Sequence, residues 1–248
     1  MIAKKLIIAI DGPAGSGKST TAQALAKRLK IPYIDTGAMY RALTLKAMQL
    51  NIPFTETERL VELSKKVSIE LVGEDPQQQK VFLDGQDVTK EIRLPELTKN
   101  VFYVAQEPLI RREMVKKQRA MGQNGGAVME GRDIGTVVFP NADYKFYFTA
   151  SEDIRAVRRQ KDLIAAGKSI ELEKIHEDIK KRDETDYNRK EGPLKQAEDA
   201  ILMDTSSLTI EETVDKIIDL MQSNPLKNRW LDNKCCSKKN PAVNDRTN

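Results

Sequence analysis

The chain has 248 residues, with 41 lysines and arginines against 37 aspartates and glutamates and a formal net charge of +4. Six basic and two acidic residues follow residue 224, so residues 1–224 hold 35 of each and are neutral overall. A neutral body and the lack of any bilayer-length apolar run argue against nucleic-acid and membrane partners. The first predicted strand begins at residue 6, which leaves no room for a signal peptide. The two cysteines are adjacent and cannot form a disulfide framework. We therefore expect a cytoplasmic protein.

A glycine-rich segment follows the first predicted strand, residues 6–10, and precedes a predicted helix at 20–29. It fits G-x-x-x-x-G-K-[ST], a pattern whose curled backbone and helix start bind nucleotide phosphates. A plain glycine turn that binds nothing is the alternative. We expect Lys18 to reach the β- and γ-phosphates and the Ser19 hydroxyl to ligate Mg²⁺. The predicted nucleotide-binding residues are Gly12, Pro13, Ala14, Gly15, Ser16, Gly17, Lys18, Ser19 and Thr20.

Short apolar runs alternate with helical patterns along the rest of the chain. The alternation predicts an α/β fold, a parallel sheet covered by helices on both faces. The last helix has a capping box, Thr209 to Glu212. Further strands are predicted at 33–35, 127–130, 145–148 and 200–204, and further helices at 38–50, 57–66, 95–105, 109–123, 152–166, 171–184 and 210–222.

One stretch breaks this alternation. Residues 67–71 and 80–83 have strand composition, and Asp84-Gly85 marks a tight turn before 87–89. We interpret this stretch as a small antiparallel insert, which could bind a second substrate.

Arginines gather where such a sheet would bind ligands. Residues 35–41 and 131–133, which include Arg41 and Arg132, follow strands at their carboxyl ends. Alone, residues 35–37 could be a helix cap, and residues 131–133 could be a turn with a surface ion pair. An arginine face on a helix could likewise be a solvated surface. Their coincidence with a phosphate loop favours phosphate binding, because arginine forks bind phosphate oxygens bidentately. Two predicted helices also carry clustered charges on one face. One face holds Arg155, Arg158 and Arg159, and the other holds Arg182, Asp186 and Arg189.

Other chemistry-bearing residues are few. His176 lies in a charged helix and is expected to face solvent rather than to act as a base. For Mg²⁺, Asp11 and Asp133 are candidate ligands beyond Ser19.

The motifs at 10–19, 35–41, 131–140 and 182–189 resemble those of bacterial cytidylate kinases, in the nucleoside monophosphate kinase family. The resemblance covers residues 5 to 221. It implies a five-stranded parallel P-loop core, and transfer of a phosphate from ATP to CMP or dCMP with Mg²⁺. It also implies a domain at 1–224, with a monophosphate-binding region at 36–105 (insert 67–94) and a helical lid at 153–168. The polar, basic tail at 225–248 is expected to be disordered.

The resemblance also implies residue roles. Lys18, Arg132, Arg158 and Arg189 would act on the transferred phosphate, Arg158 also on ATP, and Ser19 on the metal. Phe102 replaces a small hydroxyl residue often found at its position, so a ring contact with the base would replace a hydrogen bond. The implied acceptor-binding residues are Thr36, Tyr40, Arg41, Phe102, Arg111, Arg132, Asp133, Arg182, Asp186 and Arg189.

Three rival functions follow from the loop. One is a kinase for UMP or a metabolite hydroxyl. Another is a GTPase-type switch, but no Asn-Lys-x-Asp segment occurs, since Asn233-Lys234 precedes two cysteines. A nucleic-acid-binding ATPase fits the neutral body less well. We expect a monomer with small-molecule partners only.

Overall fold

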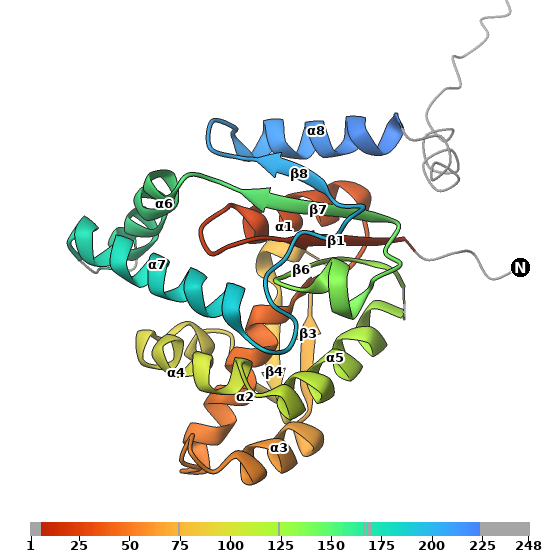
Figure 1. Ribbon diagram of the computed structural model, residues 1–248. Helices are drawn as coiled ribbons and strands as arrows, with labels where there is room; N and C mark the ends of the chain where they lie inside the picture. The colour runs from red at the N-terminus through yellow and green to blue at the C-terminus, as the bar shows by residue number, and fades with distance from the viewer. Residues whose placement is uncertain (1–5, 74, 124, 166, 168–169, 224–248) are drawn as a thin grey trace, which may run out of the picture.

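A computed structural model describes residues 6–73, 75–123, 125–165, 167 and 170–223 (Figure 1). The predicted tail at 225–248 lies outside these residues. No helix in the described part of the chain is both long and apolar enough to cross a membrane.

A parallel sheet of five strands forms the centre of the molecule, as predicted. Its order is β2-β6-β1-β7-β8, and every neighbouring pair is parallel. The strands are β1 (Ile7–Asp11), β2 (Tyr33–Asp35), β6 (Ala127–Gly131), β7 (Tyr144–Thr149) and β8 (Ile201–Asp204).

Alternate residues of β1 enter two different cores, as expected for a strand covered on both faces. Ile8 and Ile10 join the core beneath α1 (Lys18–Leu29) and α8 (Ile210–Gln222), whereas Ala9 joins the core on the side of α2 (Thr36–Gln49) and α5 (Pro108–Gln123). The capping box of α8 is present as predicted.

The strands end in register at one edge of the sheet. Asp11 pairs with Gly131 and with Tyr147, and Asp35 pairs with Glu130. The segments that follow β1, β2 and β6 are therefore brought side by side, which is where the predicted phosphate-binding motifs lie.

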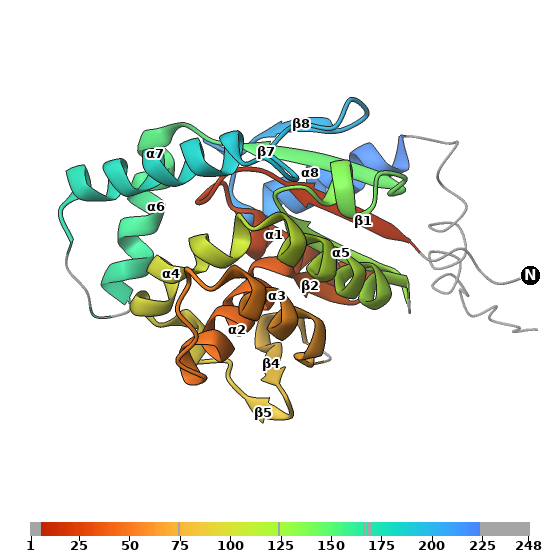
Figure 2. The same ribbon diagram turned by 60° about the horizontal axis from the view of Figure 1, so that its bottom comes forward.

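The insert is a three-stranded antiparallel sheet of β3 (Ile69–Val72), β4 (Lys80–Leu83) and β5 (Gln86–Asp87). Figure 2 shows it below the main sheet, beside α2 and α3 (Thr57–Lys66). Asp84 and Gly85 both have positive φ, 48° and 82°, in the predicted tight turn. The strand expected from residue 67 begins only at Ile69, because the N–H of Val67 donates to Leu63 O at the end of α3.

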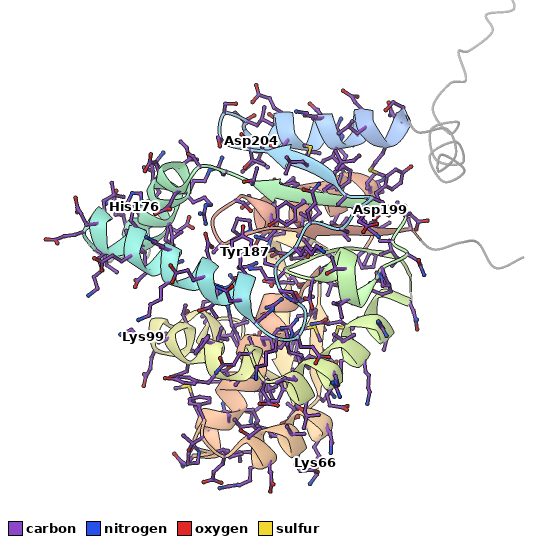
Figure 3. All side chains as sticks on the ribbon, in the orientation of Figure 1. Lys66, Lys99, His176, Tyr187, Asp199 and Asp204 are labelled. Carbon is purple, nitrogen blue, oxygen red and sulfur yellow. The ribbon has the colours of Figure 1, made fainter. Side chains whose placement is uncertain are left out.

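Two helices project beyond the carboxyl edge of the sheet, α6 (Glu152–Ala165) and α7 (Leu172–Asn188) (Figures 1 and 2). The prediction ended α7 at residue 184, four residues too early. The inner end of α7 reaches the sheet, where the hydroxyls of Tyr187 and Tyr147 are 3.4 Å apart (Figure 3). In Figure 1, α4 (Pro95–Ala105) lies below α6 and α7. Two 3₁₀ turns, η1 (Pro76–Gln78) and η2 (Glu91–Arg93), flank β4 and β5 in the chain.

One element was not predicted. Residues Ile134–Val138 form a π-helical turn, η3, directly after β6. The Asp11 carboxylate holds its start by accepting from the N–H groups of Ile134 (2.8 Å) and Gly135 (2.7 Å). Burial raises the pKa of Asp11 to about 6, although these two bonds oppose the shift.

Candidate active site

The segment after β1 is curled as the sequence predicts. Gly12 has φ +150°, and a Cβ there would lie 2.2 Å from Phe148 O, so no larger residue fits. Gly17 has φ +83° and stands immediately before α1. Within the described part of the chain, the N–H groups of Gly15, Gly17, Lys18 and Ser19 have no hydrogen-bond partner. A row of unpaired N–H groups at a helix start is suited to bind an anion.

Lys18 is buried beside this loop. Its ammonium donates to Pro13 O at 2.6 Å and lies 3.4 Å from Ser16 Oγ. Burial and then the nearby Arg132 lower the pKa of Lys18 to about 7, with Glu130 opposing the shift. The lysine is thus held by the loop, and burial together with two neighbouring arginines disfavours its charged form.

Arginines from three helices lie near one another, and one of them, Arg182, lies near Lys18 of the loop. Burial and then Arg132 lower the pKa of Arg182, on α7, to about 10. Burial also lowers the pKa of Arg41, on α2, and Arg159 on α6 adds to the shift in both. Among the described residues, Arg41, Arg159 and Arg182 form no ion pair. Positive charge that the protein leaves uncompensated indicates a binding site for a multiply charged anion.

Arg132 is the paired member of this group. Its Nε donates to Asp186 Oδ2 at 2.7 Å, and Arg189 Nη1 lies 3.7 Å from the other carboxylate oxygen. Burial opposes the charge on Asp186, but Arg132, Arg182 and Arg189 together hold the pKa of Asp186 below its usual value. The predicted face of residues 182, 186 and 189 therefore does converge with Arg132.

A second buried cluster lies behind this group. Asp133 accepts from Arg111 Nη2 at 2.5 Å and lies 3.6 Å from Arg189 Nη2. Arg111 also donates to Ala105 O and stacks on the Tyr40 ring, 5.4 Å from its centre. Within the described residues, Arg111 Nε and Arg189 Nη2 are buried without a hydrogen-bond partner. Donors without a partner in the protein are suited to bind oxygen or nitrogen acceptors of a ligand.

An aromatic pocket of about 450 Å³ adjoins Arg189. Phe102 lines it and is 39% exposed, and its ring packs edge-on against Tyr103, which in turn stacks on Phe54. The Phe102 ring, which we predicted to contact the base, is therefore accessible from this pocket.

The remaining predicted residues have mixed positions. The Thr36 hydroxyl donates to Glu130 O at 2.7 Å. The Asp35 carboxylate caps α2 by accepting from Ala38 N, and Thr36 and Arg41 remain predicted ligand contacts. Arg158 contacts the outer side of the loop, at Gly15 O and Thr205. His176, near the outer end of α7, is only partly exposed and faces Glu152 and Asp153, away from the loop (Figure 3).

The two carboxylates that we predicted as metal ligands beside Ser19 both bind other groups of the protein. Asp11 binds the start of η3, and Asp133 binds two arginines.

Glu130 was not singled out by the sequence analysis, although it is the acidic last residue of a predicted strand. Burial and the neighbouring Asp35 raise its pKa, while the Ser19 hydroxyl beside it opposes the shift. Two neighbouring carboxylates, one of them beside a hydroxyl, offer the oxygen ligands that a hard cation prefers. No group of three or more His, Cys, Asp or Glu side chains that could hold a metal occurs in the described residues.

A phosphate loop after the central strand of a five-stranded parallel sheet, opposite an arginine cluster, defines a P-loop kinase. A solved structure of an uncharacterized protein from Eubacterium ventriosum shares the fold, with a TM-score of 0.50 and 15% identity over 89% of this chain and 100% of that chain.

The family model "Cytidylate kinase" matches residues 8–223. A cytidylate kinase of Caldanaerobacter subterraneus is 50% identical over 90% of this chain and 98% of its own length, and one of Bacillus subtilis is 47% identical over 88% and 97%. The chain belongs to the cytidylate kinase family.

Proposed function

We propose that this kinase transfers the γ-phosphate of ATP to CMP or dCMP and releases ADP with CDP or dCDP. One observation carries the proposal, namely that two groups suited to bind anions lie together at one edge of the sheet. The first is the loop with its unpaired N–H groups, and the second is the arginine group around Arg41 and Arg182. The names of the relatives supply the identity of the acceptor.

On the donor side, we assign the triphosphate to residues 12–20, with Lys18 on the β- and γ-phosphates. Arg158, beside Gly15 and Thr205, serves ATP from α6. Ser19 would hold Mg²⁺, with Glu130 beside its hydroxyl and Asp35 next to Glu130. When bound, Mg²⁺ neutralises charge on the phosphate oxygens.

On the acceptor side, we assign the CMP phosphate to Arg41, Arg132 and Arg182, beside Thr36 and Tyr40. The buried donors of Arg111 and Arg189 and the Asp133 carboxylate can satisfy a base and a ribose. Phe102 lines the adjoining pocket and supplies a ring face or edge. Asp186 contributes by holding Arg132 in place.

This arrangement needs no general base, because an acceptor phosphate is already anionic near neutral pH. Catalysis then consists of alignment and of positive charge around the moving group, from Lys18, Arg132, Arg158 and Arg189. We assign residues 36–105 to the acceptor-binding region and residues 153–168 to a lid within a domain at 1–224. Their closure would exclude water, which otherwise competes as an acceptor.

A coupled assay of ADP release across CMP, dCMP, UMP, AMP and GMP tests the proposal. Turnover with CMP or dCMP well above that with the other nucleotides is expected. Higher turnover with UMP would reassign the acceptor, and ADP release that no monophosphate stimulates would refute transfer to a nucleoside monophosphate.

Arg41→Ala tests the acceptor site. We expect kcat/KM for CMP to fall about 10- to 100-fold, as one charged hydrogen bond contributes about 1.5–3 kcal/mol, while the KM for ATP stays near its original value. Arg59→Ala, in an exposed ion pair with Glu56 on α3, is the matched control and should change neither value. Equal losses for the two substrates would contradict the assignment of Arg41.

A further inference from the structure

The phosphate loop has a second face, made of its peptide carbonyls, and three side chains from distant parts of the chain hold it. We propose that Thr205 and Arg155 are positioning residues, which aim the N–H groups of the loop at the ATP phosphates by binding the carbonyls from outside. The inference rests on the proposed function and adds residues that touch neither substrate.

Three successive carbonyls are bound in this way. Ala14 O accepts from Arg155 Nη1 at 3.2 Å, and Ser16 O accepts from the Thr205 hydroxyl at 3.0 Å. Gly15 O, between them, accepts from Arg158 Nη1 at 3.4 Å. The donors come from α6 and from the residue that follows β8, so the contact joins segments about 140 to 190 residues apart.

Peptide geometry connects the two faces of the loop. In a planar trans peptide, the carbonyl of one residue and the N–H of the next point in opposite directions. A carbonyl held on the outside therefore turns the following N–H inward, so Arg155 orients the N–H of Gly15 and Thr205 that of Gly17. Both N–H groups are unpaired within the described residues. Glycine backbones rotate freely, so the loop itself does little to maintain these directions.

Thr205 is a rigid support. It is buried at 3% exposure, and its own N–H donates to Thr149 O, which extends the pairing of β8 with β7. Its carbonyl accepts from Arg158 Nη2 at 2.6 Å, and its hydroxyl accepts from Nη1 at 3.2 Å. Thr149 O lies 3.2 Å from the same hydroxyl and is the alternative acceptor for its proton. Thr205 thus links the end of the sheet, α6 and the loop.

Arg155 is supported from α7. Its Nη1 lies 2.6 Å from Asp183 Oδ2, and its Nε donates to Ala150 O. The other Asp183 oxygen is buried without a hydrogen-bond partner among the described residues, and burial raises the pKa of Asp183. The backbone at Gly15 also lies against Arg155, since a Cβ there would be 3.1 Å from Arg155 Cβ. A displacement of α7 would therefore be transmitted through Arg155 to Ala14.

Thr205→Val is the direct test, because it keeps the shape of the side chain and removes its hydroxyl. Calorimetry with inorganic tripolyphosphate, which has no nucleoside, reports on the loop alone, and ATP and CMP are titrated alongside. We expect binding of tripolyphosphate and of ATP to weaken about 3- to 10-fold, as for one lost hydrogen bond, with CMP binding unchanged. Thr205→Ser should restore both affinities.

Thr213→Val is the matched control. Thr213, in α8, is equally buried, at 2% exposure, and its hydroxyl donates to the carbonyl of Thr209, the N-cap residue of its own helix, and not to the loop. It should leave all three affinities unchanged. Asp183→Asn removes the charge that holds Arg155 and should also weaken tripolyphosphate binding, so the test remains decisive if Thr205→Val does not fold.

The outcomes separate the inference from the function on which it rests. Wild-type protein that binds neither ATP nor tripolyphosphate would contradict the phosphate-loop assignment itself. Wild-type binding of tripolyphosphate that Thr205→Val and Asp183→Asn leave unchanged would refute the positioning role alone. Weaker ATP binding with unchanged tripolyphosphate binding would also overturn it, by placing Thr205 against the nucleoside.

Discussion

Lys18→Ala should lose about 100-fold in kcat, since one preorganised charge contact to the transition state contributes on the order of 3 kcal/mol. The structure adds an expectation about stability. The Lys18 ammonium is buried and lies near Arg132 and Arg182, both of which lower its pKa. Its removal relieves this repulsion, and Ser16 Oγ still donates to Pro13 O. Turnover should therefore fall while the free energy of unfolding does not decrease, as measured by steady-state kinetics and urea denaturation.

Lys27→Ala is the control for this variant. Lys27 lies on the same helix but is 53% exposed, in an ion pair with Asp75, so kcat should stay within about twofold. Near-normal turnover in Lys18→Ala would remove the catalytic role of the loop lysine. A large loss of stability would instead show that its ammonium holds the loop together.

The phosphate loop could be predicted because its signal is local. Eight consecutive residues carry it, and the apolar run before it and the helix after it are equally local. The five strands were predicted for a similar reason, since each is a short apolar run between helices. Several element ends differ from the predicted ones, and two of these differences have a clear physical cause. Val67 has strand composition but closes α3, and α7 continues to Asn188 through polar residues that carry no periodic apolar signal.

Contacts between distant segments could not be predicted in the same way. Glu130 lies near Ser19 and Asp35 only because β6 is placed between β1 and β2. The roles of Thr205 and Arg155 depend on which way α6 and the end of β8 face. A helix-face pattern groups residues 155, 158 and 159 together, yet Arg155 is buried against the loop and Arg159 is exposed. Tertiary packing, rather than spacing along the helix, determines which of these side chains contact the loop.

Asp133→Ala should destabilise the folded protein strongly. Its carboxylate lies between the guanidinium groups of Arg111 and Arg189, and all three side chains are at most 8% exposed. Removing the carboxylate leaves the buried Arg111 without its counter-ion and leaves Arg189 with only the more distant Asp186, at 3.7 Å. Breaking a buried pair in this way typically costs about 3–5 kcal/mol. We expect the free energy of unfolding to fall by about 3 kcal/mol or more, measured by urea denaturation with a two-state fit.

Glu191→Ala provides the comparison, because Glu191 pairs with Arg112 on the same helix as Arg111 but with the arginine 62% exposed. An exposed pair contributes at most about 1 kcal/mol, so this variant should unfold nearly as the wild type does. Asp133→Asn keeps an acceptor for Arg111 without the charge, and its stability should lie between the two. If Asp133→Ala were as stable as Glu191→Ala, the carboxylate would not be the group that compensates these arginines. Arg111 and Arg189, which we assign to the base and ribose, would then be held in place by other contacts.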